Sequence, residues 1–146
     1  LSASATRQEL SLIAVSMGSD TSDQRFSACK TLLNYGFASF ESFQPEVPAE
    51  ELIPADVIRG VEEQVGLKAG SCSPVLIPKG KGAEVTRTVT LPESVEAPVK
   101  EGAALGEAVF SLEGRILARI PLTAASGVNR MDFFTAFSLL LKSLLG

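Results

Sequence analysis

The strongest constraint on the fold is the way glycine and proline interrupt the middle of the chain. Between Pro45 and Gly127 the apolar residues fall in short β-rich runs with no long helical pattern, at residues 57–61, 65–68, 75–77, 84–91, 107–112 and 115–122. The last two runs flank Glu113-Gly114, a pair typical of a two-residue hairpin turn. Short strands separated by turns indicate a sandwich or barrel. We therefore predict a small all-β sandwich over residues 44–127, which at about 80 residues can fold alone.

A different unit precedes this β-rich region. Residues 1–6 and 10–17 predict a β-hairpin whose turn lies at residues 7–9. Thr21 and Gln24 then stand at capping-box spacing, and apolar residues recur at helical spacing afterwards, which predicts an amphipathic helix over residues 22–40. One hairpin and one helix bury too little apolar surface to close a core. We expect residues 1–43 to be the C-terminal edge of an incomplete domain.

The last segment, residues 128–146, is apolar with a thin polar stripe. Thr135, Ser138 and Lys142 are spaced by three and four residues, so they share one helical face. The apolar run is shorter than the roughly 20 residues that a bilayer span needs. The pattern alone favours equally a helix in the membrane interface and a helix packed on protein. If it is a membrane helix, the predicted lipid-contacting residues are Phe133, Phe134, Phe137, Leu140, Leu141 and Leu144.

Composition excludes several classes of function. The chain has no histidine, so it contains neither a Ser-His-Asp triad nor a histidine-ligated metal site. Its formal net charge is −4 and it has no basic run, which argues against binding nucleic acid. Its two cysteines, Cys29 and Cys72, could form at most one disulfide, and two free thiols are favoured. No spacing predicts a metal site.

Two short motifs suggest chemistry without supporting it. Ser27 and Lys30 match S-x-x-K, the nucleophile signature of penicillin-recognising enzymes. They fall in the middle of a predicted amphipathic helix, and no Ser-x-Asn or Lys-[Ser/Thr]-Gly element accompanies them, so a surface serine and lysine are the better interpretation. Residues 78–82, Pro-Lys-Gly-Lys-Gly, are similar to a phosphate loop only in composition. They lie between two strand-like runs, and we interpret them as a hairpin turn.

The order of segments along the whole chain resembles the C-terminal half of the D-alanyl-D-alanine carboxypeptidase family, the low-molecular-mass penicillin-binding proteins. Residues 1–6 with 12–15 and Gly18 resemble the last hairpin of the serine-peptidase domain. Arg25 and the run 32–37, Leu-Leu-Asn-Tyr-Gly-Phe, resemble the helix that closes it. The β-rich domain that follows in this family is similar to this chain at residues 97–99, 102, 105–106 and 121–122. The apolar tail is similar to the family's membrane anchor.

This resemblance implies a mixed fold. It consists of the C-terminal hairpin and helix of an α+β, β-lactamase-like serine DD-peptidase domain (residues 1–43), a β-sandwich (44–127) and an amphipathic anchor helix (128–146). In the family, the S-x-x-K, Ser-x-Asn and Lys-Thr-Gly elements all lie upstream of this hairpin. No catalytic residue, cofactor site or metal site is therefore expected in this chain, and Ser27 and Lys30 belong to the non-catalytic closing helix.

The resemblance also implies a function for the parent protein. A serine would attack the penultimate D-Ala of a peptidoglycan stem peptide, and the terminal D-Ala would leave. The expected partners are the upstream part of the peptidase domain, the stem peptide and a membrane surface, with no nucleic acid and no cofactor. The expected location is the outer face of the cytoplasmic membrane. The alternatives are a non-catalytic cell-envelope module that binds a partner or positions another domain, and a small amphiphile-binding protein.

Overall fold

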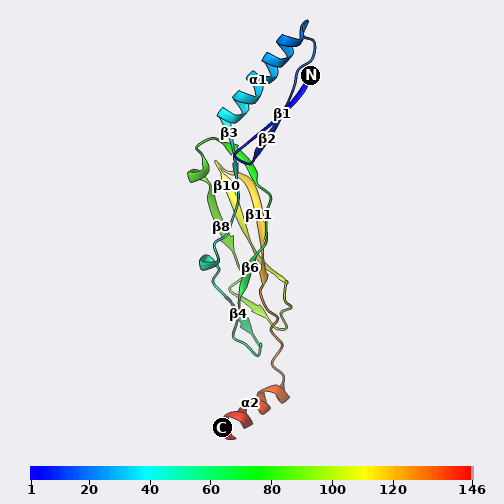
Figure 1. Ribbon diagram of the computed structural model, residues 1–146. Coiled ribbons are helices and arrows are strands. Elements are labelled where there is room, and N and C mark those ends of the chain that lie inside the picture. The colour runs from blue at the N-terminus through cyan, green and yellow to red at the C-terminus, as the bar shows by residue number, and fades with distance from the viewer. Residues whose placement is uncertain (146) are drawn as a thin grey trace. The chain divides into compact units, whose positions relative to one another are not determined.

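The computed structural model describes residues 1–145, and their side chains except those of residues 134, 135, 139, 144 and 145 (Figure 1). The described chain is mostly β-structure with one long helix. It divides into two compact units. The first unit holds residues 1–45 and 73–85, and the second holds residues 46–72 and 86–146.

The first unit begins with the predicted hairpin and helix. Strands β1 (Ser2–Arg7) and β2 (Leu10–Val15) pair antiparallel, and Gln8 and Glu9 between them adopt positive φ angles of 46° and 64°. Helix α1 (Ser22–Ser39) lies along this hairpin (Figure 1). The Thr21 hydroxyl accepts a 3.3 Å hydrogen bond from the Gln24 amide, and the Gln24 side chain accepts one from the Thr21 amide. The hairpin, the helix and the capping box are therefore confirmed.

The same unit contains the predicted strand at residues 75–77, but its pairing with a strand after α1 was not predicted. Strand β3 (Phe40–Phe43) follows α1 directly and pairs antiparallel with β7 (Val75–Pro78). Residues 78–82 therefore do not form a hairpin turn, because β7 pairs back to β3 and not forward to the next strand. A short 3₁₀ helix (Gly82–Glu84) stands where the predicted strand 84–91 was expected to start.

The second unit contains two small sheets. A four-stranded sheet has the order β6 (Leu67–Ala69), β11 (Arg115–Ala124), β10 (Ala104–Leu112) and β8 (Thr86–Thr90). A three-stranded sheet has the order β5 (Gln64–Val65), β4 (Ala55–Ile58) and β9 (Ser94–Glu96), and β4 runs parallel to β9. A 3₁₀ helix (Ala49–Glu51) precedes β4. The buried cluster of this unit draws on both sheets and consists of Ala55, Val57, Val65, Ala97, Val99, Ala124 and Val128.

Two details of this unit test the strand predictions. Glu113 and Gly114 join β10 to β11 with positive φ angles of 49° and 79°, so the predicted two-residue turn is confirmed. The predicted strand 65–68 is instead split at Gly66, with β5 in one sheet and β6 in the other. A run of apolar residues does not reveal such a change of sheet, because both pieces are β-rich.

The segment of the second unit that precedes the last helix, residues 128–131, pairs with other parts of that unit, and we call it the strap. Val128 pairs with Val99, and Arg130 pairs with Gly60, each through an antiparallel bridge. The Val61 amide donates to the Asn129 carbonyl at 2.9 Å, and the Met131 amide donates to the Arg59 carbonyl at 2.8 Å. Helix α2 (Phe133–Leu145) begins two residues after the last of these bonds.

Candidate functional site

The hairpin presents one covered and one open face. Along β2, Leu12 and Ala14 point toward α1, whereas the alternate residues point away and are exposed. Ile13 is 75% exposed, and Val15 is exposed beside it. We call the exposed row Ile13, Val15 and Met17 the open face. Large exposed apolar side chains gathered in one row are typical of a surface that contacts another protein segment, a ligand or a membrane.

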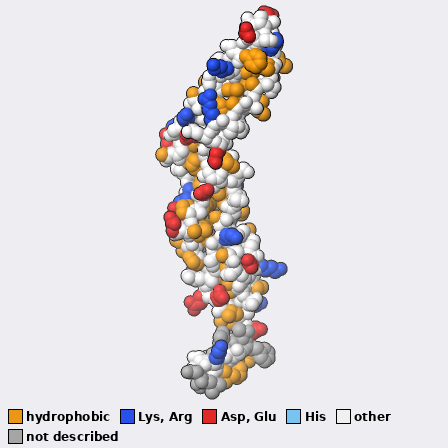
Figure 2. Space-filling view, viewed as in Figure 1, with side chains coloured by type: hydrophobic (Ala, Val, Ile, Leu, Met, Phe, Trp, Pro, Cys, Tyr) orange, Lys and Arg blue, Asp and Glu red, His pale blue; other side chains and the backbone are white. Residues whose placement is uncertain are grey.

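The edges of the hairpin are open as well. Within the described residues, β1 and β2 form a two-stranded sheet, so each strand has one edge without a neighbouring strand. A shallow apolar groove runs beside β2, and its lining includes Leu12, Val15, Leu32, Gly36 and Leu76. Hydrophobic side chains gather over this unit in the space-filling view (Figure 2). An open edge beside an apolar groove is suited to receive a further strand.

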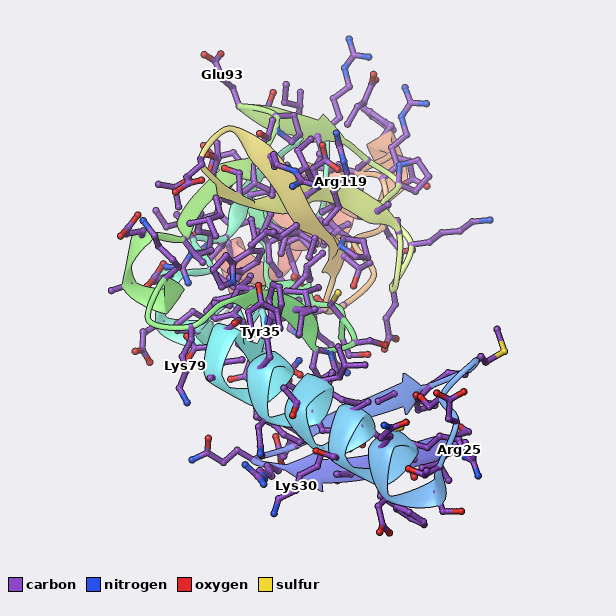
Figure 3. The ribbon with its side chains drawn as sticks, turned by 90° about the horizontal axis from the view of Figure 1, so that it is seen from above. Arg25, Lys30, Tyr35, Lys79, Glu93 and Arg119 are labelled. Atoms are coloured by element: carbon purple, nitrogen blue, oxygen red, sulfur yellow. The ribbon has the colours of Figure 1, made fainter. Side chains whose placement is uncertain are left out.

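The S-x-x-K pair lies on the surface of α1. Ser27 and Lys30 are both exposed in the helix, and Figure 3 shows Lys30 among the side chains along α1. The groove beside Lys30 is lined mainly by apolar residues of β1 and α1, including Ala3, Ala5 and Leu33. This environment agrees with the surface interpretation of the motif.

A cleft near the end of α1 was not predicted from the sequence. Its volume is about 480 Å³, and it is lined by residues of β1, α1, β3 and the segment after β7. The Arg7 guanidinium lies 4.7 Å from the centre of the Phe37 ring. Lys79 Nζ donates to the Phe37 carbonyl at 3.3 Å, close to the C-terminus of the helix, where a cation stabilises the helix dipole. Both cations therefore contact α1, which gives Lys79 of the Pro-Lys-Gly-Lys-Gly segment a structural role.

Helix α2 carries the predicted lipid-contacting residues. Phe133, Phe137, Leu140 and Leu141 are exposed, and the rings of Phe133 and Phe137 stack with centroids 6.2 Å apart. The side chains of Phe134 and Leu144 lie outside the described ones. Lys142 is in the last turn of the helix. No helix among residues 1–145 is both long enough and apolar enough to cross a bilayer.

The described residues contain no group of three side chains that could hold a metal ion. Cys29 is a free thiol that is 1% exposed, and its Sγ lies 3.7 Å from the Ala14 carbonyl oxygen on β2. It is part of the packing between α1 and the hairpin and is closed to solvent.

Comparison with known proteins places this geometry in context. Residues 40–130 match the family described as "Penicillin-binding protein 5, C-terminal domain". The chain is 35% identical over 136 residues to D-alanyl-D-alanine carboxypeptidase DacC of Escherichia coli K12, covering 92% of this chain and 34% of that protein. It is 32% identical over 130 residues to DacA of Haemophilus influenzae, covering 88% of this chain and 33% of that protein.

A solved structure of a related protein is also similar to this chain. Penicillin-binding protein 5 from Haemophilus influenzae is similar with a TM-score of 0.68 and 34% identity, over 89% of this chain and 38% of that one. The chain thus spans about a third of the length of the curated relatives that it matches.

Proposed function

This chain belongs to the family of the penicillin-binding protein 5 C-terminal domain, and from that premise we propose that it is the non-catalytic C-terminal portion of a serine-type D-alanyl-D-alanine carboxypeptidase. Residues 1–43 would complete the edge of the peptidase domain. Residues 44–127, apart from residues 73–85 that belong to the first unit, would act as a β-rich spacer, and residues 128–146 would anchor the protein. The observation that carries this proposal is the open face of the hairpin, which leaves Ile13 and Val15 exposed beside an open strand edge.

The open edge and the open face support docking against the part of the relatives that lies upstream of this match. A strand added beside β2 would use the free backbone groups of that edge, and a layer over Ile13 and Val15 would bury their side chains. In the complete polypeptide, the upstream part would supply the serine that removes the terminal D-Ala from peptidoglycan stem peptides.

Labelling of the complete polypeptide with a fluorescent penicillin tests this proposal. We expect covalent labelling, because the parent reaction passes through an acyl-enzyme. We also expect Ser27→Ala to change labelling and carboxypeptidase activity by less than about twofold, because Ser27 is an exposed side chain of α1. A folded polypeptide that does not label would support the non-catalytic envelope module instead. Loss of activity by several orders of magnitude in Ser27→Ala would identify Ser27 as the nucleophile.

We propose further that α2 lies in the outer interface of the cytoplasmic membrane. Phe133, Phe137, Leu140 and Leu141 are the described side chains that would enter it, together with Phe134 and Leu144 from the sequence pattern. A helix of 13 residues with this composition suits the interface and not a span.

The charges near α2 predict the kind of membrane attraction. Between residues 128 and 146, Arg130 and Lys142 oppose Asp132, so the side chains of this segment carry a net charge of only +1. Each base near an anionic surface contributes about 1 kcal/mol, and salt screens this contribution. We expect vesicle binding to change by less than about fivefold when ionic strength rises from about 0.05 to 0.5 M. Co-sedimentation with phosphatidylcholine vesicles, with and without an anionic lipid, measures this change of binding with ionic strength. A much larger loss with salt would show that electrostatic attraction dominates.

A further inference from the structure

The strap fixes where α2 starts relative to the three-stranded sheet. In its last backbone hydrogen bond, the Met131 amide donates to the Arg59 carbonyl. The helix begins two residues later, at Phe133. Two residues of extended chain span at most about 7 Å. Arg59, which is hydrogen-bonded to Met131, therefore lies within about 10 Å of the start of α2, and Val61, which is hydrogen-bonded to Asn129, lies within about 17 Å of it, whatever direction the helix takes.

The strap is hydrogen-bonded to Val99 through Val128, and to the β4–β5 turn, residues 59–63, through its other residues. Gly60 is bridged to Arg130. It has no room for a side chain, because a Cβ there would lie 2.7 Å from Val57 Cγ1 and 2.8 Å from Val128 Cγ1. Val61, the next residue, is bonded to Asn129 through its amide. The turn and the strap are therefore held together through their backbones.

This turn exposes apolar side chains beside a mixed set of charges. Val61 is 39% exposed and Met131 is 40% exposed. Arg59 Nη1 is paired with Glu96 Oε1 at 2.8 Å, so its charge is largely matched. Glu62 and Glu63 follow Val61 and are exposed, as is Arg130 on the strap. An apolar pair flanked by carboxylates suits a shallow contact with lipid headgroups and disfavours deep insertion.

We propose that the β4–β5 turn and Met131 form a second membrane contact, at headgroup depth, next to α2. This inference rests on the proposed membrane binding of α2, because α2 brings the turn to the bilayer. The contact makes the β4–β5 end of the second unit its membrane-proximal end. The excess of carboxylates on the turn favours zwitterionic over anionic lipid at this contact.

A fluorophore that reports its environment tests the proposal in the complete polypeptide. Val61→Cys labelled with an NBD dye, in a background lacking other accessible cysteines, should gain about twofold or more in emission with phosphatidylcholine vesicles. The matched control is Ile116→Cys, near the start of β11. Residue 116 lies about 26 Å along β11 from Ala124, which is at the strap end of the strand. A label at residue 116 should therefore stay away from the membrane, and its emission should not change.

The outcomes separate this inference from the function on which it rests. If the protein co-sediments with vesicles and the label at residue 61 stays silent, the second contact is wrong and the anchor stands. If both labels respond, the β4–β5 end is not the membrane-proximal end and the inference fails. If the protein does not co-sediment, both proposals fail.

A pair of substitutions gives an independent readout. Val61→Asp should weaken vesicle binding by about fivefold, because it places a charge at the headgroup contact. Val89→Asp is its control, since Val89 on β8 is a valine of nearly the same exposure, 38% against 39% for Val61. Equal effects of the two substitutions would overturn the proposal. Thermal unfolding checks that both variants fold.

Discussion

Removal of residues 132–146 should lower binding of the complete polypeptide to phosphatidylcholine vesicles by at least about 100-fold. The exposed side chains Phe133, Phe137, Leu140 and Leu141 are lost with this segment. Full burial of each contributes roughly 1.5–3 kcal/mol, so even partial burial of four side chains exceeds this factor. Vesicle co-sedimentation measures the change. Folding of the rest should persist, because the strap bonds that end at Met131 remain.

A pair of adjacent substitutions separates the apolar face of α2 from its polar stripe. Phe137→Asp should weaken binding by about 100-fold, because it removes an aromatic anchor and adds a charge. Ser138→Asp adds the same charge on the polar stripe and should change binding by less than about threefold. Binding that persists after removal of the segment would reject the anchor. It would favour a helix that packs on protein, which was the other interpretation of the sequence pattern.

Ile13→Asp should destabilise the complete polypeptide by about 3 kcal/mol or more. If the upstream part covers the open face, this aspartate becomes an unpaired buried charge. Ile13 is 75% exposed in the first unit, so the substitution would have little effect on a surface that stays open. We therefore expect a lower thermal midpoint and a loss of penicillin labelling at physiological temperature.

The control for this prediction is closely matched. Ile53, just before β4 in the second unit, is 74% exposed, and Ile53→Asp should change the free energy of unfolding by no more than about 0.5 kcal/mol. Differential scanning fluorimetry of both variants and the parent measures the two effects side by side. If Ile13→Asp is as mild as Ile53→Asp, the open face stays open in the complete protein and the domain-edge proposal is wrong.

The parts of the fold that were predictable are those with local signals. The turn at Glu113-Gly114, the capping box at Thr21 and the helical spacing after it each depend on neighbouring residues, and all were confirmed. The family was also predictable, because the order of segments along the chain carries it.

The parts that were not predictable depend on distant partners. Strands β3 and β9 are short, and each is a strand only because a segment far along the chain pairs with it. In the cleft near the end of α1, Lys79 donates a hydrogen bond to the Phe37 carbonyl, although the two residues are 42 positions apart in the sequence. The strap was likewise not predictable, since its four residues have no β-rich pattern and are held by backbone hydrogen bonds and by the buried side chain of Val128.

The buried thiol of Cys29 has a consequence for how the first unit moves. The Cys29 residue is 1% exposed where α1 packs on the hairpin, so we expect a thiol reagent to reach its sulfur mainly when the helix separates from the strands. The rate at which it is alkylated under native conditions therefore measures how often that separation occurs. A further layer over the open face would stabilise the unit and slow this alkylation. The alkylation rate of Cys29 therefore reports whether that layer has been added.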